Sequence, residues 1–512
     1  MINLKLADIF QDGMVLQRDK PIKIWGKANP NEKVQITLGN GDSESVMSGS
    51  DGTFATYLKP HQPTFDTKLS ILSDESHLTI NNVQIGEVFL LAGQSNMNLI
   101  LRYDHDFHAD KNQVLSGLPS NIAFYEVPKM KINDPSDPFY GDKGSWKKLN
   151  KDTAEHFSAA GYYFGMRIAK QFPDLPIGLV WMAYDGTTAS SWTSKQALEN
   201  NPILKKTFID SYDKLLADRP KGEYEKFLAM VKEQSKNPKN APFWDNVLMG
   251  NVDHKTLCDA YKNHHELFVD YVLGPESENR PHGLFDTMAS KIVGYTIKAM
   301  LWYQGESDDD HAEVYDTLLS TMINDWRSRW HDNFPVLEMQ VAPFYHWFGV
   351  FYGTYFPEIR LKQEQVARKM AKVYMTNVMD AGMKYDIHPK NKRVAGDRFA
   401  NLTLDTIYGL KQHEEAPLLA NTWRNGNQLV VSFTETNQLY MKESLNDSLA
   451  VEIAGQNVAY TPKVYENRLI LTLKQDIKAN EPVMIRYQDE PYSEATIFNE
   501  NNIPLSPFKV GM

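Results

Sequence analysis

The sequence contains a single cysteine, Cys258, among 512 residues. An internal disulfide is therefore excluded, which is consistent with a reducing compartment. No His-paired cysteine motif surrounds Cys258, so we expect a small, partly buried side chain rather than a nucleophile. Long hydrophobic runs are also missing: no apolar span reaches about 18 residues, and the first residues show no signal-peptide pattern. We therefore expect a cytoplasmic protein without a transmembrane segment.

The sequence has fewer basic than acidic residues: 54 Lys and Arg against 65 Asp and Glu, which gives a net charge of −11. This balance argues against a general binder of nucleic acid or of membrane surfaces. An anionic substrate would need a local basic patch. Repeats and low-complexity tracts are absent from the sequence. The length and the 42% apolar content are typical of a soluble protein with roughly two to four domains.

The two ends of the chain have the pattern of short β-strands separated by turn residues. In residues 1–82 the expected strands are Ile22–Lys27, Lys33–Leu38, Thr53–Leu58, Thr67–Leu72 and Leu78–Val83. In residues 411–512 they are Leu429–Thr434, Leu449–Ala454, Arg468–Leu473 and Val483–Tyr487. We predict an N-terminal and a C-terminal β-domain, each resembling a small sandwich.

Residues 83–410 alternate apolar strands and amphipathic helices, which predicts a mostly parallel sheet covered on both faces. The expected strands are Glu87–Ala92, Asn121–Val127, Ile177–Ala183, Ile297–Tyr303, Pro335–Val341 and Val373–Met379, and the helices include Thr153–Phe172, Ala312–Trp330, Glu358–Lys372 and Asn391–Tyr408. Ligands of such sheets bind beyond the carboxyl ends of the strands. A polar, mostly helical insertion at about 200–280 could cover the site. We expect its histidines, His254, His264 and His265, to be solvated rather than metal ligands.

The stretch Ile85–Met97, IGEVFLLAGQSNM, organises this middle region. Its apolar run predicts a buried strand that ends at Gly93, where glycine permits a tight turn. Ser95 then stands at a strand-to-helix turn, where a hydroxyl can be presented beside free backbone N–H groups. The alternative is that Ser95 or Asn96 only caps the helix.

The GQSNM block after an apolar strand resembles the nucleophile block of the SGNH (GDSL-like) hydrolases, in the branch that holds the sialate O-acetylesterases and some acetylxylan esterases. It differs from the elbow of the α/β-hydrolases because no glycine follows two residues after Ser95. The resemblance implies a flavodoxin-like, three-layer α/β/α catalytic domain with a parallel sheet, flanked by N- and C-terminal β-sandwich-like domains. It also implies Ser95 as nucleophile and requires no metal or organic cofactor.

A second block, Asp386-Ile387-His388-Pro389, follows the expected strand Val373–Met379. A serine hydroxyl needs an imidazole base, and an acid fixes the tautomer of that imidazole. Residues two apart in an extended chain point the same way, so Asp386 and His388 can lie side by side. Taken alone, this pair could be a solvated acid and an ordinary histidine; the resemblance to the family's D-I-H-P favours catalysis. Asp380 is the rival acid.

A third block, Trp302-Tyr303-Gln304-Gly305-Glu306-Ser307-Asp308, is similar to the family's W-x-Q-G-E-S. The resemblance implies that the Gln304 amide donates to the oxyanion. We expect Glu306 to accept hydrogen bonds that hold the nucleophile loop, with a direct catalytic role as the minority alternative. Without the family context, Gln304 would be an ordinary polar contact at a strand end.

A fourth block runs from Tyr184 to Trp192. Its Gly186 can offer a backbone N–H to the oxyanion beside that of Ser95, or be only a turn glycine. Asp185 departs from the family, which commonly has glycine there. Trp192 and Trp302 could form walls for a sugar ring, or belong to the core.

These blocks predict a serine esterase that removes O-acetyl groups from carbohydrates. The family resemblance favours sialic acid as the substrate, with acetylxylan or another acetylated oligosaccharide as the alternative. A sialate carboxylate would want a basic group, for which Arg102 is a candidate. A carbohydrate-binding protein without turnover is the rival of another class, and a serine peptidase is a weaker one. We expect an O-acetylated carbohydrate as the partner, and neither nucleic acid nor membrane.

Overall fold

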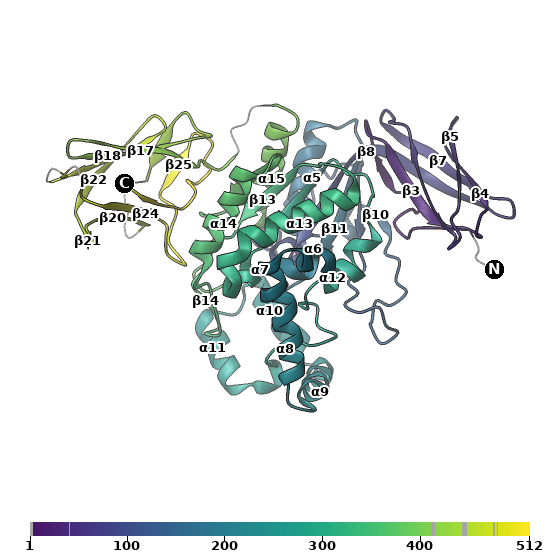
Figure 1. The fold of residues 1–512 in the computed structure, drawn as a ribbon, viewed down its shortest axis with the longest axis horizontal. Helices are drawn as coiled ribbons and strands as arrows, with labels where there is room; N and C mark the ends of the chain where they lie inside the picture. Colours follow the sequence, from purple (N-terminus) through teal and green to yellow (C-terminus); the bar gives the residue numbers. More distant parts are fainter. Residues whose placement is uncertain (1–3, 40, 411–414, 443–447, 475–476, 479) are drawn as a thin grey trace. The chain divides into compact units, whose positions relative to one another are not determined.

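The structure is a computed structural model that describes residues 4–39, 41–410, 415–442, 448–474, 477–478 and 480–512 (Figure 1). It forms two compact units. The first holds Met1–Tyr224, Tyr271–Trp302 and Leu318–Val336, and the second holds Glu225–Asp270, Tyr303–Thr317 and Leu337–Met512. The division into three domains stays a prediction, and the boundary expected at residue 411 lies outside the described residues. In the described parts of the chain, no helix is both long and apolar enough to cross a membrane.

The N-terminal part of the first unit consists of strands, as expected. They are β1 (Lys5–Leu6), β2 (Val15–Gln17), β3 (Ile22–Lys27), β4 (Lys33–Leu38), β5 (Asp42–Met47), β6 (Thr53–Leu58) and β7 (Thr64–Leu72). Strands β1, β3 and β6 form one antiparallel sheet, while β4 pairs with β5 and β7. The alternating pattern therefore located β3, β4 and β6 at their observed bounds.

Strand β8 (His77–Gly93) is a single strand of 17 residues. The sequence predicted two strands here, Leu78–Val83 and Glu87–Ala92, with the domain boundary at 82/83; that boundary falls inside β8. The buried Glu87 carboxylate is compensated, since Gln17 Nε2 donates to it at 2.7 Å, Arg18 Nε at 2.8 Å and Lys298 Nζ lies 3.3 Å away. These contacts join β2 and the start of β12 to the middle of β8.

The carboxyl-terminal half of β8 belongs to a large mixed sheet. In the first unit the strand order is β10 (Trp146–Lys148), β9 (Ile122–Glu126), β11 (Ile177–Ala183), β8 and β12 (Ala299–Tyr303). Strand β11 is parallel to both β8 and β9, and β10 is antiparallel to β9. The parallel pairs bring the carboxyl ends of β8 and β11 to the same edge.

Helix α5 (Ala159–Gln171) packs on this sheet through two glycines. A Cβ at Gly161 would lie 2.5 Å from Leu91 Cδ1, and one at Gly165 would lie 2.9 Å from Leu179 Cδ1, so neither position accepts a larger side chain without displacement. The predicted helix Thr153–Phe172 is broken into α4 (Lys151–Ala154) and α5. The break occurs because the Ser158 side chain caps α5.

The remaining helices of the first unit are short, apart from α13. They are α1 (Ser95–Asn98), η1 (Leu101–Tyr103), α2 (His105–Ala109), α3 (Lys111–Val114), η2 (Ala189–Trp192), α6 (Lys195–Asn200), α7 (Pro202–Leu204), the π-helix η3 (Lys205–Asp210), α8 (Ser211–Asp218), α12 (Gly283–Thr287), η5 (Ala289–Lys291) and most of α13 (Tyr315–Trp330). The predicted apolar face of α13 is buried at Leu318, Leu319, Met322 and Trp326.

The second unit contains the other half of the insertion and the segment around the D-I-H-P block. Its elements are α9 (Glu223–Lys236), α10 (Asn240–Met249), α11 (His254–Asn263), η4 (His265–Leu267), η6 (Glu306–Val314), β13 (Val336–Gln340), β14 (His346–Trp347), β15 (Phe351–Tyr352), α14 (Phe356–Lys369), β16 (Val373–Asn377) and α15 (Lys392–Thr406). The insertion is helical in both units, as predicted. Strands β13 and β16 pair with each other.

The C-terminal segment consists of strands around one apolar core. They are β17 (Leu419–Asn425), β18 (Gln428–Phe433), β19 (Leu439–Met441), β20 (Leu449–Ile453), β21 (Gln456–Asn457), β22 (Tyr460–Tyr465), β23 (Arg468–Leu473), β24 (Val483–Tyr487), β25 (Ile497–Asn499) and β26 (Phe508–Gly511). The two main sheets of this segment have the strand orders β17-β18-β23-β22 and β21-β20-β24-β26 (Figure 1). Their strands bury residues such as Leu429, Val451 and Ile485.

Candidate active site

Ser95 begins helix α1 directly beyond the end of β8. Gly93 has φ 141°, in the region that favours glycine, and Gln94 is the residue that caps α1. The backbone N–H of Asn98 donates to the Gln94 carbonyl at 2.9 Å, so Gln94 occupies the N-cap position and Ser95 lies in the first turn of the helix. The alternative that Ser95 or Asn96 is the cap is therefore not what the structure shows. Ser95 is 9% exposed.

The turn that carries Gly186 lies beside the Ser95 turn. Ala183, the last residue of β11, is in register with Gly93 of β8, and Tyr184 N donates to Gly93 O at 3.2 Å. Asp185 Oδ1 accepts a hydrogen bond of 2.8 Å from Asn98 Nδ2 in α1. Gly186 has φ 67°, a conformation that favours glycine. Parallel pairing thus brings these two predicted blocks together.

Helix α1 is also held from the side of α5. Ser158 Oγ donates to Met97 O at 2.7 Å and accepts from Gly161 N at 3.0 Å. Ala159 N donates to Leu99 O at 2.8 Å. One serine therefore both starts α5 and fixes the helix that contains Ser95, a role that the sequence did not reveal.

Trp192 and Trp302 are core residues. Both side chains are fully buried. Trp192 Nε1 donates to Thr187 Oγ1 at 3.0 Å, and the Trp302 ring packs edge-on against Trp326 at 6.3 Å between centroids. A sugar-stacking wall requires an exposed ring face, so the structure corrects that suggestion in favour of the core alternative.

The second unit brings Asp386 and His388 together as predicted. Asp386 Oδ1 lies 3.4 Å from His388 Nδ1 and accepts a hydrogen bond of 2.8 Å from the His388 backbone N–H. Burial lowers the pKa of His388 below its usual 6.5, which favours the neutral imidazole. Burial alone would raise the pKa of Asp386, but hydrogen bonding to His388 and the charge of Lys390 outweigh it and hold that pKa at about 2.

Lys390 is a member of this cluster that sequence reasoning missed. Its ammonium lies 2.9 Å from Asp386 Oδ2, on the carboxylate oxygen not facing His388, and its side chain is only 8% exposed. The alternation of Asp386, His388 and Lys390 in D-I-H-P-K could have pointed to it. The Trp347 ring packs edge-on against the His388 imidazole, with 5.0 Å between centroids.

The rival acid, Asp380, has a different partner. Its two carboxylate oxygens accept hydrogen bonds of 2.6 and 2.8 Å from Arg398, in a bidentate pair. Arg398 also donates to Asn377 O at 2.9 Å, which ties α15 to the end of β16. Of the two candidate acids, Asp386 is therefore the one beside His388.

The amide of Gln304 has a defined orientation. Its Nε2 donates to Asp308 Oδ2 at 2.6 Å, and the Tyr315 hydroxyl donates to its Oε1 at 3.0 Å. Gly305, with φ 147°, separates Gln304 from the buried Glu306, which begins η6. Asp308 and Tyr315 thus fix the orientation of the Gln304 amide, because one accepts from its nitrogen and the other donates to its oxygen. The sequence predicted this role for neither residue.

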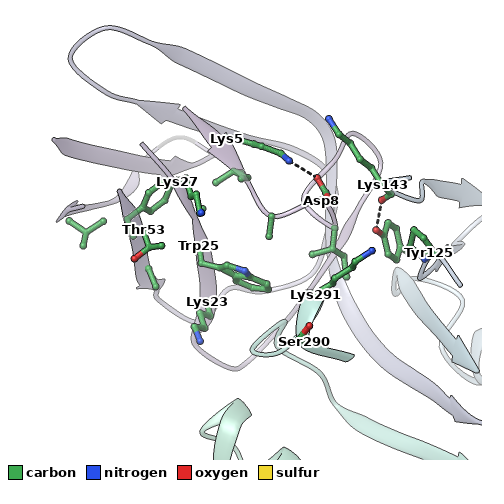
Figure 2. A pocket seen from close by; sticks show the side chains of 18 of the residues that line it. Lys5, Asp8, Lys23, Trp25, Lys27, Thr53, Tyr125, Lys143, Ser290 and Lys291 are labelled. Carbon is green, nitrogen blue, oxygen red and sulfur yellow. Dashed lines mark hydrogen bonds and ion pairs between the residues drawn. The ribbon is translucent and has the colours of Figure 1, made fainter. Parts of the chain in front are cut away.

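A cavity of about 640 Å³ lies elsewhere in the first unit, between the N-terminal strands and the large sheet (Figure 2). Trp25, Tyr125 and Lys291 are among its lining residues, and none of the predicted site residues lines it. Within the described part of the chain, no three His, Cys, Asp or Glu side chains gather as they would around a metal ion.

Comparison with known proteins gives the family. A family model described as "Carbohydrate esterase, sialic acid-specific acetylesterase" matches residues 85–219 and 281–405, which include every predicted site residue. Sialate O-acetylesterases of Rattus norvegicus and Mus musculus are each 24% identical over 446 residues, covering 80% of this chain and 74% of theirs. A carbohydrate acetylesterase from Xanthomonas citri has a similar fold, with a TM-score of 0.73, 21% identity and 99% coverage of both chains.

The chain therefore belongs to the sialic acid-specific acetylesterase family of carbohydrate esterases, and it is a carboxylic ester hydrolase. A second model, described as a putative flagellar system-associated repeat, matches residues 412–491 in the C-terminal strands.

Proposed function

We propose that this protein removes O-acetyl groups from sialic acid, with Ser95 as nucleophile, His388 as general base and Asp386 as the acid that orients it. The observation that carries the proposal is the buried Asp386–His388 pair, in which a carboxylate with a pKa of about 2 faces an imidazole whose pKa is lowered by burial. A neutral imidazole held by an ionised carboxylate is what activation of a serine requires.

The reaction has two half-reactions. Ser95 Oγ attacks the acetyl carbonyl carbon while His388 takes the hydroxyl proton. As the tetrahedral intermediate collapses, the bond between the carbonyl carbon and the sugar oxygen breaks, and His388 delivers the proton to that oxygen. Water then attacks acetyl-Ser95 with His388 again as base, which releases acetate and restores the serine.

The oxyanion of each tetrahedral intermediate would accept hydrogen bonds from the N–H groups of Ser95 and Gly186 and from the Gln304 amide. The backbone contacts that place Gly186 beside the Ser95 turn support the first two donors. The hydrogen bonds from Gln304 to Asp308 and from Tyr315 to Gln304 support the third, because they orient the amide. Donors fixed in advance stabilise developing charge without reorganisation. Glu306 then acts by holding the nucleophile loop.

We also propose the finer architecture: a three-layer α/β/α domain over 83–410 between β-domains at 1–82 and 411–512. The alternation of strands and helices along the chain supports it. We propose a cytoplasmic location as well, which is supported by the presence of a single cysteine, Cys258, and hence of no internal disulfide.

Covalent labelling tests the nucleophile. A fluorophosphonate probe should modify the peptide that contains Ser95, as mapped by mass spectrometry, and the Ser95→Ala variant should stay unlabelled. Labelling of a different serine, or equal labelling of the variant, contradicts the assignment. An unreactive wild-type protein would favour the rival hypothesis of a carbohydrate binder without turnover.

A further inference from the structure

Three exposed tyrosines surround the segment that leads into Asp386. The side chains of Tyr345, Tyr352 and Tyr385 are 44%, 49% and 38% exposed. The rings of Tyr345 and Tyr352 meet edge-on at 6.4 Å across the β14–β15 hairpin. Exposed aromatic side chains in a group are typical of a binding surface, because leaving them in water is unfavourable.

The hairpin is fixed to the catalytic segment by the backbone. The N–H groups of Tyr345 and His346 both donate to the Lys384 carbonyl, at 3.1 and 3.3 Å. The next residue of the hairpin, Trp347, packs on the imidazole of His388. The exposed rings and the proposed base are therefore held by one short, continuous stretch of structure.

The insertion fixes the third ring. His254, at the start of α11, stacks on Tyr385 with 4.1 Å between ring centroids and 10° between planes. Tyr385 is thus oriented from one side by the insertion, directly before Asp386 in the chain. This contact gives His254 a structural role.

Lys384 places a positive charge among these rings. Its ammonium lies 6.0 Å from the Tyr345 ring centroid and 5.4 Å from that of Tyr385. A cation is attracted to the faces of aromatic rings, which holds the flexible side chain near the tyrosines. Among the residues that the structure places, no carboxylate forms an ion pair with Lys384.

We propose that Tyr345, Tyr385 and Lys384 form a subsite for the sugar that leaves during acetyl transfer, and that Lys384 binds the carboxylate of that sugar. The inference rests on the proposed function, since His388 must protonate the leaving sugar oxygen and the sugar must therefore lie beside His388. The tyrosine rings pack against the C–H groups of the sugar ring. Sialic acid carries a carboxylate that is ionised at neutral pH, and the ammonium of Lys384 complements it. Lys384 is a candidate for this contact in addition to Arg102, which stays a prediction.

Steady-state kinetics with three substrates distinguish the contact of Lys384 with the sugar carboxylate from the contact of Tyr345 with the sugar ring. Lys384→Met should raise KM for O-acetylated sialic acid about tenfold, the loss of one charge-assisted contact, with kcat unchanged. Its KM for acetylated xylooligosaccharides and for a nitrophenyl acetate ester should not change. Tyr345→Ala should raise KM for both sugars and leave the nitrophenyl ester unaffected.

Matched controls come from the C-terminal strands. Lys442 also lies over an aromatic ring, at 4.3 Å from the Phe498 centroid, and Tyr465 is 53% exposed on β22. Lys442→Met and Tyr465→Ala should change no kinetic constant. The proposal is overturned if Lys384→Met raises KM equally for charged and neutral sugars, or leaves all of them unchanged.

Binding of the product separates failure of the subsite from failure of the proposed function. Free sialic acid should bind the Ser95→Ala variant in an NMR titration, and adding Lys384→Met should weaken that binding about tenfold. If the wild-type enzyme releases no acetate, the proposed function fails, while this titration still decides on the subsite. Absent binding, or binding that Lys384→Met does not weaken, overturns the subsite.

Discussion

Asn98 donates a hydrogen bond of 2.8 Å to Asp185, and this contact joins the helix that begins at Ser95 to the turn that carries Gly186. The family resemblance of the Tyr184–Trp192 block implies a glycine at the position of Asp185. Its carboxylate makes a contact that a glycine could not make. The two proposed backbone donors of the oxyanion hole are therefore linked by a side-chain hydrogen bond.

Removing that link should loosen the oxyanion hole without changing its donors. We expect Asp185→Ala to lower kcat about threefold to tenfold, in line with the net worth of one hydrogen bond near the surface. Asp185→Asn keeps the accepting oxygen and should retain near-normal kcat. Steady-state kinetics on a nitrophenyl acetate ester decide this; equal losses in the two variants would argue against the hydrogen bond as the cause.

The two aspartates near the end of β16 should differ in their effect on kcat. Asp386→Asn removes the partner of His388 and should lower kcat by about a hundredfold or more. It also leaves the buried Lys390 ammonium without its carboxylate, so the melting temperature should fall as well. Asp380→Asn leaves the buried Arg398 without its carboxylate, and should lower the free energy of unfolding by about 1–3 kcal/mol while the folded enzyme keeps its kcat. Thermal melts and kinetics on both variants give the answer; loss of kcat at unchanged stability in Asp380→Asn would make Asp380 the catalytic acid.

The sequence located most strands because their apolar or alternating patterns are local. Ile177–Ala183, for example, is β11 at its exact bounds. Strand β5, Asp42–Met47, was missed because its first four residues are polar and none of its residues is fully buried. The continuity of β8 was missed because pairing with different strands at its two ends leaves no mark in the local sequence.

Parts of the site could likewise be predicted only where a motif is contiguous. The spacing in D-I-H-P placed Asp386 beside His388, since the contact lies within three residues. The bonds from Ser158 to Met97 and from Asn98 to Asp185 join residues 61 and 87 positions apart, and no spacing rule predicts them. Such contacts depend on how β8, β11 and α5 pack.

The pH dependence should follow from the buried imidazole. The base must be neutral, and burial lowers the pKa of His388 below 6.5, so kcat/KM should rise along an acidic limb with a midpoint below pH 6.5. The cations Lys390 and Lys392 add to this lowering, while Asp386 opposes it. Lys390→Met should therefore shift the limb to higher pH, and Lys390→Arg should leave it nearly in place. If the midpoint of the acidic limb is the same in Lys390→Met as in the wild type, the charge of Lys390 does not lower the pKa of His388.

The buried Glu338 in β13 should lower the free energy of unfolding at neutral pH. Its carboxyl group is fully buried, and burial raises its pKa well above 4.5. The folded protein then holds a proton that the unfolded chain releases, so this group lowers the free energy of unfolding increasingly as pH rises above 4.5. Glu338→Gln, which cannot ionise, should raise the melting temperature more at pH of about 8 than at pH of about 5. A shift that is equal at both values would contradict the raised pKa.

The central claim is that Ser95 carries the acetyl group during hydrolysis of an O-acetylated sugar. The most direct measurement is acetate release from O-acetylated sialic acid by the wild-type protein and by Ser95→Ala, with circular dichroism to show that both are folded. We predict steady release by the wild type and a loss of about a thousandfold or more in the folded variant. Full release by Ser95→Ala would contradict the mechanism, and release from acetylated xylooligosaccharides alone would keep the mechanism and contradict the substrate.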